Sequence, residues 1–283
     1  MTSRDCGAET APETAYAKIN LALHVRRKRA DGYHDLESLF AFTVDGDRLW
    51  AAPSDGLTLS ISGPFAVGLS DGADNLVMRA AFALREAFSI TAGAALSLEK
   101  NLPVASGIGG GSADAAAALR SLCKLWGINK NSQQLTQIAK KLGADVPACV
   151  VSETLYGDGK GDALTSVSLP ELSGTPLLLV NPGVALSTAQ VFARWDGVDR
   201  GALDRNNPFD GRNDLTAPAI ALVPEIGALL DLLKGLPGVT LARMSGSGAT
   251  CFALCESFTA RDGAALLISQ AMPKAWCLPT EIK

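Results

Sequence analysis

The sequence has few of the residues from which metal centres and disulfide frameworks are built. It contains two histidines and six cysteines among 283 residues, and no two cysteines form a CxxC pair. Zinc sites usually use closely spaced cysteines and histidines, so we expect no metal site made of protein ligands. The cysteines are expected to be free thiols in a reducing compartment.

Positive charge and long apolar runs are also scarce. The formal net charge is −4, whereas proteins that bind nucleic acid need a basic face that neutralises phosphates. No run approaches the ~18 apolar residues of a membrane-spanning helix. The first residues, MTSRDCG, lack the apolar segment of a secretory signal. We therefore expect a cytoplasmic protein that binds neither nucleic acid nor a membrane.

Apolar residues recur in patterns typical of both strands and helices. They make up 47% of the chain against 19% charged residues, which is sufficient for a sizeable core. The expected elements include strands over 16–25, 36–44, 94–98, 177–180 and 250–254 and helices over 76–88, 112–126, 223–234 and 259–270. Asp74-Asn75 is expected to cap the first of these helices, and Asn131 or Ser132 is expected to begin a further helix that ends at Gly143. The Gly- and Asp-rich segment 156–162 (YGDGKGD) is predicted to be a linker. Strands and helices in both halves indicate the α+β class.

The most informative segment is the glycine-rich loop over residues 103–114, PVASGIGGGSAD. It follows a predicted strand and precedes an alanine-rich helix, so glycine amides and the helix N-terminus can both point at an anion. Ser112 adds a hydroxyl. The loop lacks the GK[ST] ending of a Walker A motif and does not match GxGxxG. This context favours a triphosphate cradle over a flexible turn or a close-packed glycine cluster.

Three segments resemble the motifs of the GHMP kinases, a family of small-molecule kinases. Residues 103–117 (PVASGIGGGSADAAA) look like motif 2, residues 15–23 (AYAKINLAL) like motif 1 and residues 241–252 (LARMSGSGATCF) like motif 3. The extra glycine of GGGSAD is similar to the branch of the family that phosphorylates 4-diphosphocytidyl-2-C-methyl-D-erythritol. DGYH at 31–34, followed by Leu39-Phe40, is similar to the same branch.

The resemblance implies a two-domain α+β fold with the active site in the cleft. A ribosomal-protein-S5-like domain over 1–162 would carry the ATP loop and the catalytic aspartate, and a ferredoxin-like domain would cover 163–283. The implied reaction is ATP-dependent phosphorylation of the 2-hydroxyl of 4-diphosphocytidyl-2-C-methyl-D-erythritol in non-mevalonate isoprenoid synthesis. ATP and Mg²⁺ are the implied cofactors, and a cytidine diphosphate derivative is the implied partner of a monomer or homodimer. Another GHMP small-molecule kinase and a non-catalytic ligand-binding sensor of the same fold stay open as alternatives.

The resemblance assigns Lys18 and Asp145 to catalysis. Asp145 lies in GADVP, which looks like the family's catalytic segment. It is implied to take the proton of the acceptor hydroxyl, while Lys18 keeps it ionised. From the residues alone, an aspartate there usually serves as a turn or cap residue. Lys18 and Asn20, on one face of the first strand, also fit an ordinary solvated sheet face.

The resemblance also implies which residues bind the nucleotide. They are Lys100, Pro103, Val104, Ala105, Ser106, Gly107, Ile108, Gly109, Gly110, Gly111, Ser112 and Ala113. For Lys100, which precedes the loop, an exposed lysine at a strand end is the competing interpretation.

A third group is predicted to bind the acceptor. Tyr33 and Phe40 offer stacking faces to a pyrimidine, and His34 offers a donor and an acceptor to its edge. Phe192 is implied to close the aromatic sandwich. The full set is Asn20, Tyr33, His34, Phe40, Thr188, Phe192, Gly246 and Ser247. The competing interpretation is that these aromatics belong to the core, and His24 is expected to be an ordinary surface histidine.

Overall fold

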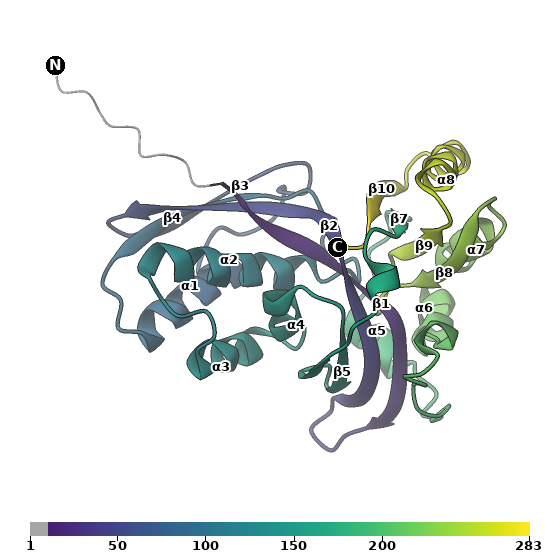
Figure 1. Ribbon diagram of the computed structural model, residues 1–283, viewed down its shortest axis with the longest axis horizontal. Coiled ribbons are helices and arrows are strands. Elements are labelled where there is room, and N and C mark those ends of the chain that lie inside the picture. Colours follow the sequence, from purple (N-terminus) through teal and green to yellow (C-terminus); the bar gives the residue numbers. More distant parts are fainter. Residues whose placement is uncertain (1–10) are drawn as a thin grey trace. The chain divides into compact units, whose positions relative to one another are not determined.

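A computed structural model describes residues 11–283 (Figure 1). The chain divides into two compact units, each drawn from several stretches of the sequence. Within the described residues, the first unit comprises 11–15, Gly46–Leu102 and Gly111–Val150, and the second comprises Tyr16–Asp45, Pro103–Gly110 and Val151–Lys283. The boundary near residue 162 between two sequence-contiguous domains stays a prediction.

The helices and strands of each unit are as follows. The first unit holds the second half of β2 (His34–Ser54), β3 (Leu57–Ser62), α1 (Leu76–Ala87), β4 (Gly93–Glu99), α2 (Gly110–Trp126), α3 (Gln133–Leu142) and α4 (Val146–Val151). The second holds β1 (Glu13–Lys28), the first half of β2, β5 (Leu155–Gly159), β6 (Ala163–Ser166), β7 (Pro176–Asn181), α5 (Thr188–Ala193), α6 (Thr216–Leu222), α7 (Glu225–Lys234), β8 (Val239–Met244), β9 (Cys251–Cys255), α8 (Phe258–Ala271) and β10 (Trp276–Glu281). None of these helices is long and apolar enough to cross a membrane.

Strand β4 is the middle strand of the first unit's sheet. It pairs antiparallel with residues 48–54 of β2 and parallel with β3. Two helices of this unit, α1 and α3, begin at side-chain caps. Asn75 accepts a hydrogen bond from the Val77 N–H at α1, and Ser132 accepts one from the Leu135 N–H at α3. Both caps agree with the helix starts that the sequence predicts.

The second unit contains two sheets. In one, β1 pairs with β2, residues 36–40 of β2 pair antiparallel with β5, and β5 pairs with β6. In the other, the strand order is β10-β7-β9-β8 and all neighbours are antiparallel. One buried cluster joins β7, α7 and α8 through Leu178, Val180, Ile226, Leu229 and Ile268. The mixture of sheets and helices in both units confirms the α+β class.

The segment predicted to be a linker is part of a sheet instead. Residues 155–159 form β5, which pairs with residues 36–40 of β2 and continues through a turn into β6. A Cβ built on Gly157 would lie 2.3 Å from Cε2 of Phe40. The glycine is there because an aromatic ring approaches the backbone closely, which is a recognised use of glycine inside a strand.

Candidate active site

Lys18 and Asn20 are buried in β1, and each is 3% exposed. The alternative of an ordinary solvated sheet face is therefore wrong. Lys18 Nζ donates to Asn20 Oδ1 at 2.8 Å, and Asn20 Nδ2 donates to Ser38 Oγ at 2.8 Å. The Ser38 hydroxyl donates in turn to the Ala22 carbonyl at 2.7 Å. This chain of hydrogen bonds fixes the orientation of the Asn20 amide and the position of the Lys18 ammonium.

The three family motifs meet at the hydroxyl of Ser245. It accepts a hydrogen bond from the Asn20 N–H at 3.2 Å and donates one to the Gly107 carbonyl at 2.9 Å. The Lys18 N–H donates to the Ile108 carbonyl at 2.9 Å. The first strand and the turn of the third motif are thus both bonded to the glycine loop.

The glycine loop requires glycine at position 107. Gly107 has a φ of 79°, and a Cβ there would lie 2.6 Å from the carbonyl oxygens of Gly248 and Ser245. Helix α2 begins shortly afterwards, at Gly110, and has no acidic side chain in its first turn. A tightly packed glycine loop that runs into a 17-residue helix suits an anion such as a nucleotide phosphate.

Lys100 lies in the interior of the first unit, so the interpretation as an exposed lysine is wrong. It is 2% exposed, and its ammonium donates to Asp47 and, at 2.8 Å, to Asp114 of α2. Burial raises the pKa of Asp114 to about 8, against the opposing charge of Lys100. The contact of Lys100 with the nucleotide stays a prediction.

Asp145 lies in the turn between α3 and α4. Its carbonyl accepts a hydrogen bond from the Cys149 N–H at 3.0 Å, and its side chain is half-buried. A Cβ built on Gly143, two residues earlier, would lie 4.0 Å from Oγ of Ser112. The segment that carries Asp145 is therefore packed beside the first turn of α2. The catalytic role of Asp145 stays a prediction.

An aromatic group surrounds His34 in the second unit. The ring centroids of His34 and Phe192 are 4.9 Å apart with planes at 30°, and Trp195 meets His34 edge-on at 5.5 Å and 86°. Tyr33 is 56% exposed, with the Lys160 ammonium 4.5 Å from its ring centroid. Burial lowers the pKa of His34, so the imidazole is neutral at pH 7 and has one donor and one acceptor.

Phe40, Thr188 and Ser247 occupy different surroundings. Phe40 is 2% exposed, and the Lys18 ammonium lies 5.0 Å from its ring centroid. The ring thus supports Lys18 through a cation–π contact, and its stacking on a ligand stays a prediction. Thr188 Oγ1 and Ser247 Oγ are hydrogen-bonded at 2.8 Å. This bond joins the first turn of α5 to the turn of the third motif.

Several residues of this region were not assigned from the sequence. They are Ser38, Trp195, Asn213 and Ser245. Asn213 Nδ2 donates to the carbonyls of Met244 and Gly246 at 2.7 and 2.8 Å, so it fixes the turn of the third motif. The sequence could have indicated Ser38, because it lies two residues before the predicted acceptor residue Phe40 and therefore on the same face of the strand. No local pattern marks Asn213.

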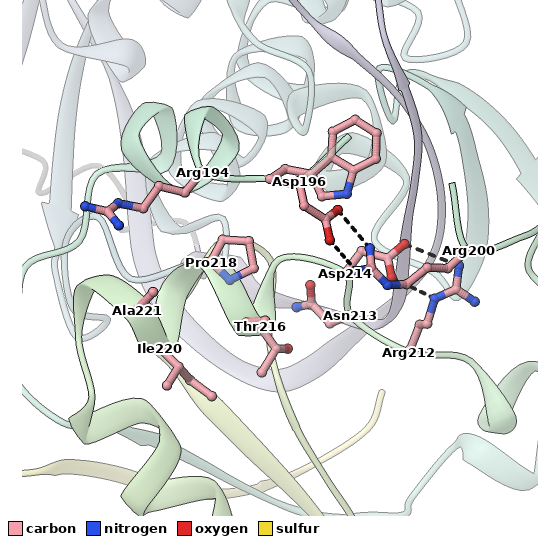
Figure 2. A pocket seen from close by; sticks show the side chains of 12 residues that line it. Arg194, Asp196, Arg200, Arg212, Asn213, Asp214, Thr216, Pro218, Ile220 and Ala221 are labelled. Carbon is pink, nitrogen blue, oxygen red and sulfur yellow. Dashed lines mark hydrogen bonds and ion pairs between the residues drawn. The ribbon is translucent and has the colours of Figure 1, made fainter. Parts of the chain in front are cut away.

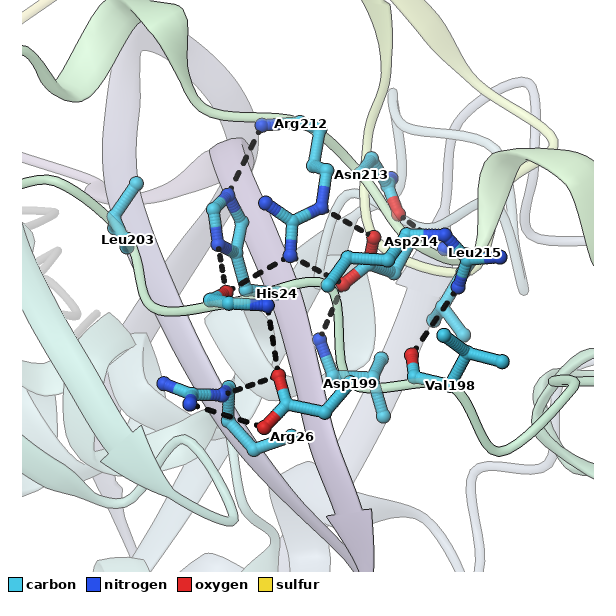
Figure 3. Close-up of polar contacts among 12 residues, drawn as sticks. His24, Arg26, Val198, Asp199, Leu203, Arg212, Asn213, Asp214 and Leu215 are labelled. Carbon is cyan, nitrogen blue, oxygen red and sulfur yellow. Dashed lines mark hydrogen bonds and ion pairs between the residues drawn. The ribbon is translucent and has the colours of Figure 1, made fainter.

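The expectation that His24 is an ordinary surface histidine is wrong. It is 2% exposed, its Nε2 accepts the Arg212 N–H at 3.1 Å, and its Nδ1 lies 3.1 Å from the Gly201 carbonyl oxygen (Figure 3). The neighbouring Val25 N–H donates to Asp214 Oδ2 at 2.8 Å. These contacts attach the long segment between α5 and α6 to strand β1.

Comparisons with known proteins agree with these motifs. The model of the GHMP kinases N terminal domain matches residues 75–153, and that of the GHMP kinases C terminal matches residues 196–276. The chain is 53% identical over 277 residues to the 4-diphosphocytidyl-2-C-methyl-D-erythritol kinase of Rhizorhabdus wittichii, with 96% of this chain and 94% of the relative covered. It is 51% identical over 268 residues to the enzyme of the same name from Novosphingobium aromaticivorans, with 93% and 90% covered.

Solved structures lead to the same family. A crystal structure of 4-(cytidine 5'-diphospho)-2C-methyl-D-erythritol kinase matches with a TM-score of 0.81 and 32% identity, covering 95% of this chain and 99% of that one. A homoserine kinase from Cytophaga hutchinsonii matches with a TM-score of 0.75 and 16% identity, covering 100% and 98%, which shows the fold alone. The chain therefore belongs to the GHMP kinases, and within them to the family of its 4-diphosphocytidyl-2-C-methyl-D-erythritol kinase relatives.

Proposed function

We propose that this protein transfers the terminal phosphate of ATP to the 2-hydroxyl of 4-diphosphocytidyl-2-C-methyl-D-erythritol, a step of non-mevalonate isoprenoid synthesis. The observation that carries the proposal is the hydrogen-bonded junction of Asn20, Ser245 and Gly107. It attaches the strand with the buried lysine directly to the glycine loop, as a phosphotransferase that aligns acceptor and donor requires. The names of the relatives support the choice of acceptor.

The glycine loop and the first turn of α2 fit the phosphates of ATP, which supplies the transferable group when bound. Gly107 and Gly109 adopt left-handed conformations, and the turn carries no acidic side chain. Among the described residues, no three His, Cys, Asp or Glu side chains gather as ligands for a metal ion. We therefore expect Mg²⁺ to be bound mainly by the phosphates of the nucleotide, with the hydroxyl of Ser112 as a candidate contact through water.

The predicted acceptor residues have separate roles in binding and activation. Asp145 orients the acceptor hydroxyl and accepts its proton. Lys18 and Asn20 contact the acceptor from positions that their hydrogen bonds already fix, so little reorganisation is needed during the reaction. His34 and Phe192 bind the pyrimidine, because a neutral imidazole offers both a donor and an acceptor to the cytosine edge.

The test is ADP release from the full chain with Mg-ATP and 4-diphosphocytidyl-2-C-methyl-D-erythritol, with mevalonate as the comparison acceptor. We expect turnover with the cytidine compound alone. Asp145→Asn should lower kcat by about 100-fold or more, because general-base catalysis typically contributes that much. Asp71→Asn, at an exposed aspartate, is the matched control and should keep wild-type turnover. Activity in Asp145→Asn equal to the control would remove Asp145 from the mechanism.

Two further outcomes separate the alternatives. Inhibition by cytidine monophosphate is expected if the site binds the pyrimidine, and its absence together with turnover of another acceptor would favour a different GHMP kinase. ATP binding by the folded protein without turnover of any acceptor would favour a non-catalytic sensor.

A further inference from the structure

Among the described residues, two aromatic rings contact the side chain of His34. Phe192 lies nearly parallel to the imidazole, and Trp195 meets it at a right angle. Neither ring nitrogen has a hydrogen-bond partner in the part of the chain that the structure describes. The two rings therefore restrict the orientation of the imidazole while both nitrogens stay available to a ligand.

Trp195 and Phe192 are set by one short turn at the end of α5. The Trp195 N–H donates to the Phe192 carbonyl at 3.2 Å, and both side chains pack against the core of the second unit. The indole Nε1 of Trp195 is buried without a hydrogen-bond partner among the described residues. The contact of Trp195 with His34 is therefore made by its aromatic ring and involves no hydrogen bond of the indole.

Trp195 also borders a pocket of about 590 Å³, whose other walls include Arg194, Pro218 and Ile220 (Figure 2). Trp195 therefore belongs both to the wall of this pocket and to the aromatic group around His34. A side chain without a ring at position 195 would remove one of the two rings that contact the imidazole. His34 could then turn about its side-chain bonds, because no hydrogen bond restrains its ring.

We propose that Trp195 is a positioning residue that holds the His34 ring in the orientation needed to hydrogen-bond the cytosine edge of the acceptor. This inference rests on the proposed function, which assigns the pyrimidine to His34 and Phe192. Trp195 acts through His34 and sets the affinity for the acceptor, with no part in phosphoryl transfer itself.

The first test compares steady-state kinetics of Trp195→Leu, Trp195→Phe and wild type with both substrates. Leucine keeps apolar bulk and removes the ring, so KM for the cytidine acceptor is expected to rise about 3- to 10-fold, the range of an aromatic pair contact. The values of kcat and of KM for ATP should stay within about 2-fold. Phenylalanine restores a ring and should return KM close to the wild-type value. Equal changes in both KM values, or no rescue by phenylalanine, would overturn the proposal.

A matched control uses the other tryptophan whose Nε1 is buried without a partner, Trp126 at the end of α2. Trp126→Leu removes a comparable half-buried indole far along the chain from His34. It should leave KM for the cytidine acceptor unchanged. A rise equal to that of Trp195→Leu would mean that loss of packing, and not loss of the contact with His34, causes the effect.

A second test needs no substrate, so it stands even if the protein has no activity on the cytidine acceptor. The chain has two histidines, and their Cε1–H signals in NMR can be assigned with His34→Gln. Trp195→Leu should move the His34 signal and raise the pKa of His34 toward its ordinary value, because a ring that covers the imidazole is gone. The signal of His24 should not move. An unchanged His34 signal in folded Trp195→Leu would refute the positioning role.

Discussion

At the residue scale, the surroundings of His24 have a consequence for pH. Because Nε2 accepts the Arg212 N–H, the proton of the neutral ring lies on Nδ1, which donates to the Gly201 carbonyl. A second proton, on Nε2, would point at the backbone N–H of Arg212 and would break this hydrogen bond. Burial, and next the positive charge of Arg212, lower the pKa of His24, while the hydrogen bond to Gly201 and the charges of Asp214 and Glu37 act in the opposite direction. The folded chain therefore resists protonation at this site.

We expect the protein to lose stability in mild acid through His24. The unfolded ring has a pKa of about 6.5, so below this pH the unfolded chain binds a proton that the folded chain does not. The contribution is complete above about pH 6.5 and is lost as the pH falls through the lower folded value. His24→Asn keeps a donor for Gly201 and should make the free energy of unfolding depend less on pH between 7.5 and 5.5. Urea unfolding at several pH values measures this.

His34→Asn is the control for this experiment. Burial also lowers the pKa of His34, but His34 is only half-buried whereas His24 is 2% exposed, so we expect the smaller shift at His34. This variant should keep most of the wild-type loss of stability in acid. The same pH dependence in His24→Asn and wild type would mean that His24 is not the group that titrates.

At the element scale, the strands and helix ends that were predicted correctly are those whose sequence pattern lies within a few neighbouring residues. The alternating residues 16–25 lie in β1, and the caps Asn75 and Ser132 begin α1 and α3. Helix α3 ends before Gly143, as its sequence indicates. Periodicity and capping are properties of one turn or one strand, so they can be recognised without knowledge of the fold.

The sequence did not predict those helices and strands whose formation depends on contacts with residues far away in the chain. Helices α4 and α6 have six and seven residues, too few to show a helical period. Strand β10 contains Pro279 and is defined by its pairing with β7. In β5, Gly157 and Asp158 are unfavourable strand residues, and the glycine is explained only by the ring of Phe40.

The close approach at Gly157 predicts a defined cost for a single methyl group. Gly157→Ala would place Cβ inside contact distance of the Phe40 ring, so either the ring or β5 must move. We expect the free energy of unfolding to fall by about 1–3 kcal/mol, as for overpacked core positions. Since the Lys18 ammonium lies over the same ring, kcat should fall as well. Urea unfolding and the ADP-release assay measure the two effects.

Gly56→Ala is the matched control, because a Cβ at Gly56 meets no atom within 4 Å. Its stability should stay within about 0.5 kcal/mol of wild type. Equal stability of the two variants would show that β5 accommodates the methyl group without displacing Phe40.

The features of the candidate site also fall into two groups: residues that short sequence motifs indicate, and contacts that depend on residues far apart in the sequence. Short motifs and their family resemblance pointed to Lys18, Asn20 and Phe192, and the structure places Phe192 against His34. The bond from Ser245 to Gly107 joins residues 138 positions apart, so no pattern within either motif could indicate it. The same holds for the partners of Lys100, which depend on how β4 and α2 pack.

At the scale of the whole molecule, sequence order and compact units do not coincide. Residues 36–40 of β2 pair with β5 in the second unit, whereas residues 48–54 of the same strand pair with β4 in the first. Residues 103–110 belong to the second unit, although α2 continues from them into the first. The division into two contiguous segments near residue 162 follows the order of the motifs in the sequence and stays a prediction.

Residues 280–282 pack into the second unit. Ile282 is 1% exposed and exchanges hydrogen bonds with the backbone of Gly174 and Thr175, at 2.7 and 3.0 Å. Thr280 is 2% exposed and donates to Asp45 Oδ2 at 2.7 Å. Contacts between segments so far apart in sequence form only when the unit as a whole is folded, so their loss should reduce the stability of the entire unit.

Ile282→Ala tests this dependence. Removal of a fully buried isoleucine side chain typically costs about 2–5 kcal/mol, so the urea midpoint should fall clearly while the slope of the transition stays unchanged. Lys274→Ala, at an exposed position in the same terminal region, should leave the midpoint where it is. A midpoint that falls together with a reduced slope would indicate that the terminal residues detach separately. A single transition with an unchanged slope would instead mean that these residues unfold together with the rest of the unit.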